Sequence, residues 1–132
     1  MLIAQISDPH IVEPGKKACD VAPTSERLAQ LVTCLNTLDP LPDVALITGD
    51  ITHDGTAAQA AQAKHLLDPL KMPYHVVPGN HDDRTTLGKV FSGQTCPTQD
   101  AEFLHYVIED YDIRLIGLDS AKSGASGGEF CQ

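Results

Sequence analysis

Three short apolar runs, at residues 2–7, 44–48 and 74–77, predict β-strands. The first run lacks strict alternation of apolar and polar positions, which indicates a strand covered on both faces. Apolar residues at helical spacing predict helices over residues 28–38, 56–67 and 84–91, with Thr24 or Ser25 as the expected N-cap of the first. Strands and helices in the order βαβαβα predict a parallel sheet, and ligand sites in such sheets lie at the carboxyl ends of the strands.

The pattern of apolar positions changes after residue 91. We expect a loop over residues 93–100, followed by a hairpin of two β-rich runs at residues 103–109 and 113–118. The segment 121–132 is rich in Gly and Ser, and only Glu129 and Phe130 suggest a further element there. No internal repeat or linker is visible, so residues 1–132 are interpreted as a single α/β domain.

A polar motif follows each of the three predicted parallel strands. These motifs are Asp8-Pro9-His10, Gly49-Asp50 and Gly79-Asn80-His81-Asp82. Their carboxylate, imidazole and amide oxygen groups suit divalent zinc, iron or manganese. If the backbone stays extended through Pro9, Asp8 and His10 point to the same side and can share one ion. The sequence therefore predicts a metal site at one edge of the sheet.

Each of these motifs, taken alone, also has an ordinary structural explanation. The first can be an exposed turn, the second a helix cap or turn, and the third an Asx-type turn that caps the next helix. His53 is interpreted as a solvent-exposed loop histidine, with a place at the mouth of the site as the alternative. His75 and His105 lie within predicted strands and are interpreted as structural or surface residues.

Composition and charge restrict the class of protein. At 132 residues and 42% hydrophobic content, the chain can bury one core. No apolar run approaches the roughly 20 residues needed to cross a bilayer, and the N-terminal run is too short for a signal peptide. Four cysteines without CxxC spacing are expected to be free thiols. We therefore predict a cytoplasmic protein without a membrane partner.

The net charge of −9 argues against a nucleic acid polymer as partner, because such binding depends on Lys and Arg neutralising phosphates. It does not exclude a small phosphate ester. Two bound divalent cations would add about four positive charges where that substrate sits and would reverse the local field.

The three motifs, in this order and at this spacing, resemble the calcineurin-like metallophosphoesterase superfamily. The stretches ISDPH, ITGDITHDG, VPGNHDD and LDSAKSGASGG are most similar to its cyclic nucleotide phosphodiesterase and glycerophosphodiesterase branch. The resemblance covers nearly the whole chain. It implies a metallophosphoesterase-type layered α/β sandwich, here its N-terminal part only, with βαβαβα followed by a β-hairpin.

The resemblance also implies a role for particular residues. Asp8 and His10 would hold the first metal ion, Asp50 would bridge to the second, and Asn80 would bind the second. His81 is the candidate catalytic residue, placed near the phosphate to stabilise developing charge or to protonate the leaving oxygen.

The implied reaction is in-line hydrolysis of a cyclic nucleotide or another small phosphodiester. The resemblance assigns it to hydroxide bound to two divalent ions of iron, manganese or zinc. Asp82 is expected to orient His81 or to cap the next helix.

The sequence also departs from the family pattern, which continues with a histidine on a later strand and a GHxH segment. Nothing here corresponds to either, so the chain supplies three candidate ligands to one ion and two to the other, with Asp50 counted in both. We therefore expect weak metal affinity at the second position, and an exposed apolar surface that favours a homo-oligomer or marginal stability. The alternative to an active hydrolase is a C-terminally truncated, catalytically inactive fragment that at most binds metal weakly.

Overall fold

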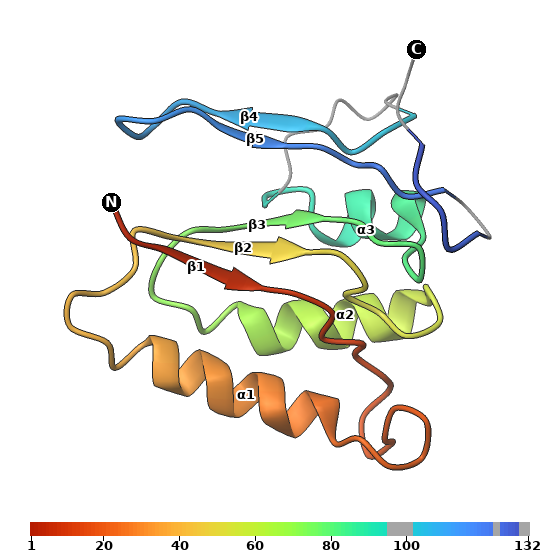
Figure 1. Cartoon of the computed structure of the whole chain (residues 1–132). Helices are drawn as coiled ribbons and strands as arrows, with labels where there is room; N and C mark the ends of the chain where they lie inside the picture. The colour runs from red at the N-terminus through yellow and green to blue at the C-terminus, as the bar shows by residue number, and fades with distance from the viewer. Residues whose placement is uncertain (95–101, 123–124, 130–132) are drawn as a thin grey trace.

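The computed structural model describes residues 1–94, 102–122 and 125–129 (Figure 1). Its elements, in chain order, are β1 (Ile3–Ile6), α1 (Thr24–Leu35), β2 (Val44–Thr48), α2 (Ala57–Leu67), β3 (Tyr74–Val77), α3 (Arg84–Val90), β4 (Tyr106–Ile108) and β5 (Leu115–Gly117). The first three strands form a parallel sheet in the order β1-β2-β3, and β4 pairs with β5 in an antiparallel hairpin. The predicted mixed α/β fold, βαβαβα followed by a hairpin, is confirmed. Most of the predicted loop at 93–100, and Phe130, lie outside the described residues.

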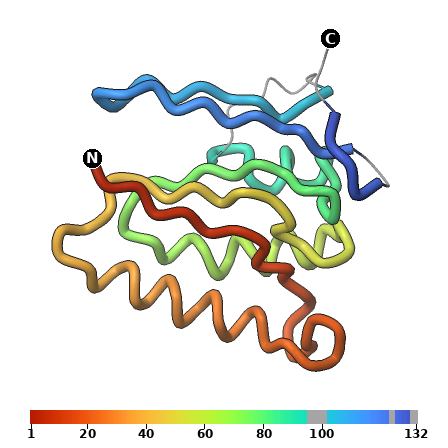
Figure 2. The backbone as a smooth tube through the Cα atoms, viewed as in Figure 1, coloured from red at the N-terminus to blue at the C-terminus, as the bar shows by residue number. Residues whose placement is uncertain are grey.

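The sheet lies between a helical layer and the hairpin (Figures 1 and 2). Helices α1 and α2 lie on one side of the sheet, and β4 and β5 lie on the other. Alternate strand residues point into the core on the helical side, because successive side chains of a strand face opposite ways. Their partners are apolar residues of the helices, and the core includes Ile6, Ala45, Ile47, Tyr74 and Val76 from the strands and Leu28, Val32, Ala63 and Leu67 from α1 and α2.

Strand β1 is covered on one face only, so the prediction of cover on both faces is wrong for this strand. Ile6 is buried, but Ile3 is 37% exposed. The physical reason is that α1 and α2 pack against the face that carries Ile6, while Ile3 and Gln5 on the opposite face stay exposed. Apolar residues of and beside the hairpin are also about half exposed, namely Val107, Ile113, Ile116 and Leu118. The described residues thus expose apolar side chains, and association between copies of the chain stays a prediction.

The start of α1 differs from the expected cap. Thr24 is the first helical residue, Pro23 occupies the N-cap position, and no side chain caps the helix there. The Thr24 hydroxyl instead donates a hydrogen bond to the carbonyl oxygen of His10, at 3.0 Å. The prediction of Thr24 or Ser25 as N-cap is therefore wrong, because the threonine hydroxyl holds the loop after β1.

Two further predictions from the sequence concern thiols and membranes. Cys19 and Cys34 are free and exposed, while Cys96 and Cys131 lie outside the described residues. Within the described part of the chain, none of the helices is both long and apolar enough to span a bilayer.

Candidate metal centre

The loops that follow β1 and β2 stay paired beyond the ends of their strands. The backbone N–H groups of Asp8, His10 and Ile11 donate to the carbonyl oxygens of Gly49, Asp50 and Ile51, at 3.2, 2.9 and 2.9 Å. These bonds continue the parallel pairing of β1 with β2 into the loops. The first two predicted motifs therefore lie side by side at the carboxyl edge of the sheet.

The backbone at the candidate ligands is left-handed. Asp8, His10 and Asp50 have φ angles of +54°, +43° and +46°. The expectation of extended backbone through Pro9 is therefore wrong, although the side chains still converge. A non-glycine residue in this region stores roughly 1–3 kcal/mol of strain, and such residues cluster at functional sites. Aspartate and histidine are among the residues that tolerate it best.

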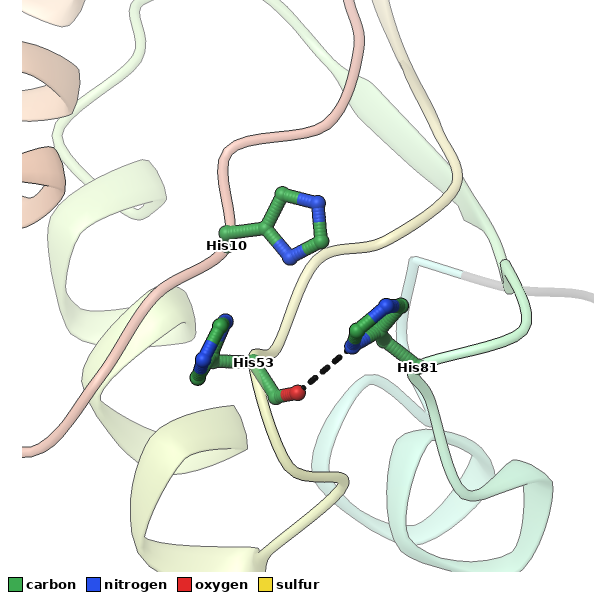
Figure 3. A group of neighbouring side chains, drawn as sticks. All are labelled: His10, His53 and His81. Atoms are coloured by element: carbon green, nitrogen blue, oxygen red, sulfur yellow. Dashed lines mark hydrogen bonds between the residues drawn. The ribbon is translucent and has the colours of Figure 1, made fainter. Parts of the chain in front are cut away.

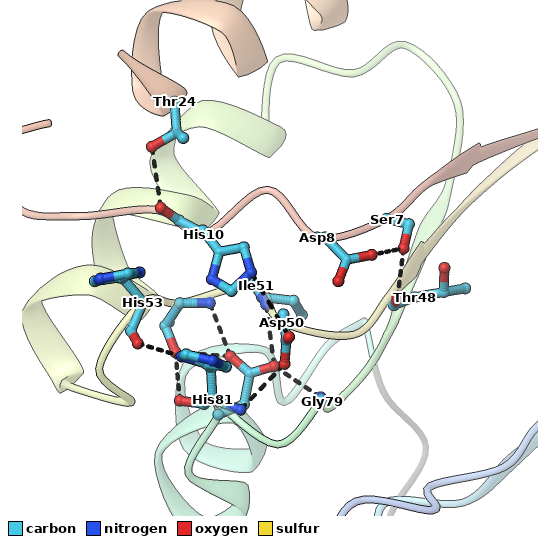
Figure 4. Close-up of polar contacts among 12 residues, drawn as sticks. Ser7, Asp8, His10, Thr24, Thr48, Asp50, Ile51, His53, Gly79 and His81 are labelled. Atoms are coloured by element: carbon cyan, nitrogen blue, oxygen red, sulfur yellow. Dashed lines mark hydrogen bonds and ion pairs between the residues drawn. The ribbon is translucent and has the colours of Figure 1, made fainter. Parts of the chain in front are cut away.

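Side chains from the first two motifs converge on one point (Figure 4). One donor atom each of Asp8, His10 and Asp50 lies within 4.8 Å of the other two, and His10 Nε2 lies 3.6 Å from Asp50 Oδ2. Asp8 is exposed and accepts a hydrogen bond from the Ser7 hydroxyl, while His10 and Asp50 are half-buried. Two carboxylates and one imidazole form a mixed oxygen and nitrogen donor set, and this set fits a divalent zinc, iron or manganese ion.

The third loop packs directly against Asp50. The backbone N–H of His81 donates to Asp50 Oδ1 at 3.1 Å. A Cβ at position 79 would lie 2.1 Å from the same oxygen, so only glycine fits there. Asn80 lies between Gly79 and His81, and its side chain is exposed. The structure thus brings Asp8, His10 and Asp50 together and puts Asn80 on the adjoining loop, where its role as a ligand stays a prediction.

His81 lies at the rim of the site, with a defined ring orientation. Its Nδ1 lies 2.7 Å from the carbonyl oxygen of His53, and its ring centroid lies 4.7 Å from that of His10. Because a carbonyl oxygen only accepts, Nδ1 carries the proton in this contact. Nε2 is therefore the nitrogen available to a ligand.

Asp82 joins the second and third loops, and neither of its predicted roles is correct. Asp83 caps α3, because its side chain accepts from the backbone N–H of Thr86. Asp82 accepts from the backbone N–H groups of Ile51 and Thr52, from the Thr52 hydroxyl, and from the backbone N–H of Gly79, at 2.7 to 3.0 Å. Asp82 and Asp83 both precede α3, and the sequence alone does not indicate which of them caps the helix.

His53 also belongs to the site, so its interpretation as an exposed loop histidine is wrong. Its side chain is half-buried, and its Nδ1 is buried without a hydrogen-bond partner. The ring centroid lies 5.6 Å from that of His10 and 5.8 Å from that of His81. His53 is thus in ring contact with two candidate site residues.

Comparison with known proteins agrees with the resemblance seen in the motifs. The chain is 38% identical to a probable glycerophosphodiester phosphodiesterase of Arcobacter nitrofigilis, over 97% of this chain and 46% of that protein. It is 32% identical to a glycerophosphodiester phosphodiesterase of Enterobacter lignolyticus, over 97% and 46%. It is 28% identical to a 3',5'-cyclic adenosine monophosphate phosphodiesterase of Pseudomonas aeruginosa, over 97% and 44%. The chain spans about half the length of the curated relatives it matches.

A solved structure supports the fold. The crystal structure of AQ665 from Aquifex aeolicus, a protein of unknown function, matches with a TM-score of 0.50 at 19% identity, over 93% of this chain and 63% of that one. The family model described as calcineurin-like phosphoesterase matches residues 1–126. With a match of this extent, the chain belongs to the calcineurin-like phosphoesterase family.

Proposed function

We propose that this chain carries part of the active site of a metal-dependent phosphodiesterase that acts on small diesters. The observation that carries the proposal is the convergence of Asp8, His10 and Asp50, each in a left-handed conformation at a strand end. Strained, polar and partly exposed groups of this kind are typical of catalytic sites rather than of packing. Membership of a phosphoesterase family supports the same conclusion.

In this proposal Asp8 and His10 would hold one divalent cation, Asn80 would hold a second, and Asp50 would contribute to both. When bound, iron, manganese or zinc ions polarise the phosphate and activate water for in-line attack. The geometry around Asp50 supports its bridging role, because the third loop contacts its side chain and fixes its orientation. The second position has fewer donors from this chain than the first, so it would bind its ion more weakly.

The proposed role of His81 is to act on the phosphate as a positioned acid. The carbonyl oxygen of His53 holds Nδ1–H, which fixes the ring. Nε2, when protonated, can donate to a phosphate oxygen as charge develops there, or give its proton to the departing oxygen. The exposure of His81 supports this role, since a substrate can reach it from solvent.

The proposed substrates are cyclic nucleotides and other small diesters. The named relatives act on glycerophosphodiesters and cyclic AMP. The net charge of −9 disfavours a nucleic acid polymer, which needs a basic surface. A cytoplasmic location belongs to the same proposal, and the free thiols Cys19 and Cys34 support it.

The alternative function is a fold that binds metal weakly and catalyses nothing by itself. The small donor set at the second position favours it, because the proposal assigns that position two of the described residues, Asp50 and Asn80.

Hydrolysis of bis(p-nitrophenyl) phosphate by this chain with added Mn²⁺ tests the proposal. We expect Mn²⁺-dependent turnover that falls at least about 100-fold in Asp50→Asn and in Asn80→Ala. Asp20→Asn is the matched control, because Asp20 is also a left-handed aspartate but is exposed and lies outside the site. No turnover at any Mn²⁺ concentration, with calorimetry showing Mn²⁺ still bound through Asp50, would establish the inactive alternative for this chain.

A further inference from the structure

Three imidazole rings from three different loops meet beside the carboxylates (Figure 3). His10 follows β1, His53 follows β2, and His81 follows β3. One ring nitrogen of each lies within 4.8 Å of the other two. The ring centroids are 4.7, 5.6 and 5.8 Å apart. This group shares only His10 with the donor set of Asp8, His10 and Asp50.

Two of these rings have a nitrogen without a hydrogen-bond partner. Nδ1 of His10 and Nδ1 of His53 are both buried and unpartnered among the described residues. A buried polar atom left without a partner costs roughly 1–3 kcal/mol. A ligand that accepted the lone pairs of these nitrogens would remove that cost.

The third ring is already held as metal-bound histidines usually are. A ligating imidazole almost always donates its other N–H to a carbonyl or carboxylate oxygen, which fixes the ring and the tautomer. Nδ1 of His81 makes such a contact with the carbonyl oxygen of His53, at 2.7 Å. Nε2 of His81 is therefore left with its lone pair.

We propose that His10, His53 and His81 form a second kind of cation site, with nitrogen ligands only. Imidazole donors suit Zn²⁺, Ni²⁺ and Cu²⁺, whereas Mn²⁺ and Mg²⁺ prefer carboxylate and carbonyl oxygens. A tetrahedral zinc ion about 2.0–2.1 Å from each nitrogen would hold the nitrogens roughly 3.4 Å apart. To bring the nitrogens from within 4.8 Å to that separation, the three rings would have to turn. The proposal does not depend on phosphodiester hydrolysis.

His10 makes the two sites compete. Its Nε2 faces Asp50 Oδ2 at 3.6 Å, and its buried Nδ1 is the nitrogen left for the three-histidine site. A neutral imidazole has one N–H and one lone pair, so it binds one cation at a time. An ion held by the three histidines therefore withdraws His10 from the carboxylate set, and withdraws Nε2 of His81 from any substrate.

Isothermal titration of the metal-free chain with Ni²⁺ and, separately, with Mn²⁺ tests this site. We expect His53→Ala to weaken Ni²⁺ binding by no less than the roughly 10–100-fold that loss of an outer hydrogen-bond partner costs. Mn²⁺ affinity should stay unchanged in that variant. Asp8→Asn should have the opposite effect: it should weaken Mn²⁺ binding and leave Ni²⁺ affinity unchanged. His65→Ala is the matched control, because His65 is exposed in the last turn of α2.

A measurement on the unaltered chain avoids any dependence on how the variants fold. Adding Zn²⁺ should shift the side-chain NMR resonances of His10, His53 and His81 together and leave those of His65 in place. Nickel affinity unchanged in a folded His53→Ala variant, or a His53 ring that does not respond to Zn²⁺, would overturn the proposal. Failure of the hydrolysis assay with Ni²⁺ binding intact would instead remove the proposed function and leave this site standing.

Discussion

Asp82 and Asp119 each accept four hydrogen bonds, but they join different parts of the molecule. The donors to Asp82 are all neutral groups of the second and third loops. Asp119 is fully buried and accepts two bonds from the Arg84 guanidinium, at 2.6 and 3.1 Å. It also accepts from the backbone N–H groups of Leu104 and Ala121.

The two carboxylates have different structural roles: Asp82 holds the loops of the candidate site, and Asp119 holds parts of the fold together. Asp82 fixes loops that the sheet already supports, so we expect its contacts to set the direction of the candidate ligands. Asp119 connects the segment after β5 to α3, where Arg84 also lies 4.7 Å from the Phe103 ring centroid. The hydrogen bond with Asp119 raises the pKa of Arg84 above its usual range, so the guanidinium stays charged. The two positions should therefore respond differently to substitution.

The largest effect is expected at Asp119. Asp119→Ala leaves the Arg84 guanidinium without its buried partner, and breaking such a pair costs roughly 3–5 kcal/mol of unfolding free energy. Urea denaturation measures the loss. Asp112→Ala, at an exposed aspartate between β4 and β5, is the control and should change little. If Asp119→Ala lost no more unfolding free energy than the control, Asp119 would not have the stabilising role proposed for it.

At Asp82 the expected change is smaller in stability and larger in metal binding. Asn presents an NH₂ group to donors that need an acceptor, so Asp82→Asn should cost about 1–3 kcal/mol. Residues that orient metal ligands typically change affinity by roughly 10–100-fold, and we expect that loss for Mn²⁺ by calorimetry. Asp83→Asn is the control, because Asn caps helices as well as Asp does. Equal Mn²⁺ affinity in both variants would show that Asp82 supports only the fold.

Gly79 offers a sharper probe of the same loops. Gly79→Ala forces a Cβ to within 2.1 Å of Asp50 Oδ1, so the carboxylate must move. We expect a stability loss of roughly 1–3 kcal/mol from overpacking, together with weaker Mn²⁺ binding. Gly93→Ala is the control, since nothing lies within 4 Å of its added Cβ. Unchanged Mn²⁺ binding in Gly79→Ala would exclude Asp50 from the ligand set.

The smallest effect is expected at Asp68, an exposed carboxylate that completes the comparison. Hydrogen bonds from Lys64 and Tyr74, at 2.6 and 2.7 Å, lower its pKa below the usual 3.8. A lowered pKa means stability that is present above about pH 4 and is lost as the pH falls through the folded value. For an exposed pair this amounts to about 0.3–0.5 kcal/mol.

Urea denaturation of the native chain and of Asp68→Asn checks the prediction. The native chain should be slightly more stable at pH 7, and the gap should close near pH 2. A gap that persists in acid would assign the effect to something other than the charge of Asp68.

Much of the fold followed from local pattern. The predicted ranges for α2, β2 and β3 agree closely with the structure. Alanine favours helices and β-branched residues favour strands, so these segments have strong local preferences. The hairpin strands are shorter than predicted, at Tyr106–Ile108 and Leu115–Gly117. Strand length there depends on pairing and on contact with the sheet, which sequence propensity does not contain.

The site was only partly predictable. Residue types and spacing identified Asp8, His10 and Asp50, and the structure brings these three together. The left-handed φ angles were not foreseen, because they depend on how neighbouring loops constrain one another. His53 and Asp82 were misassigned for a similar reason, since their contacts are with loops about 30 residues away.

The left-handed backbone at residues 8, 10 and 50 creates a trade-off between thermal stability and the side-chain donors at these positions. Glycine would relieve the backbone strain at each position, but it would also remove the side-chain donor atom. A library of variants sorted by heat resistance alone should therefore accumulate glycine at these three places. Only sorting that also demands a bound ion should keep the acidic and imidazole groups there.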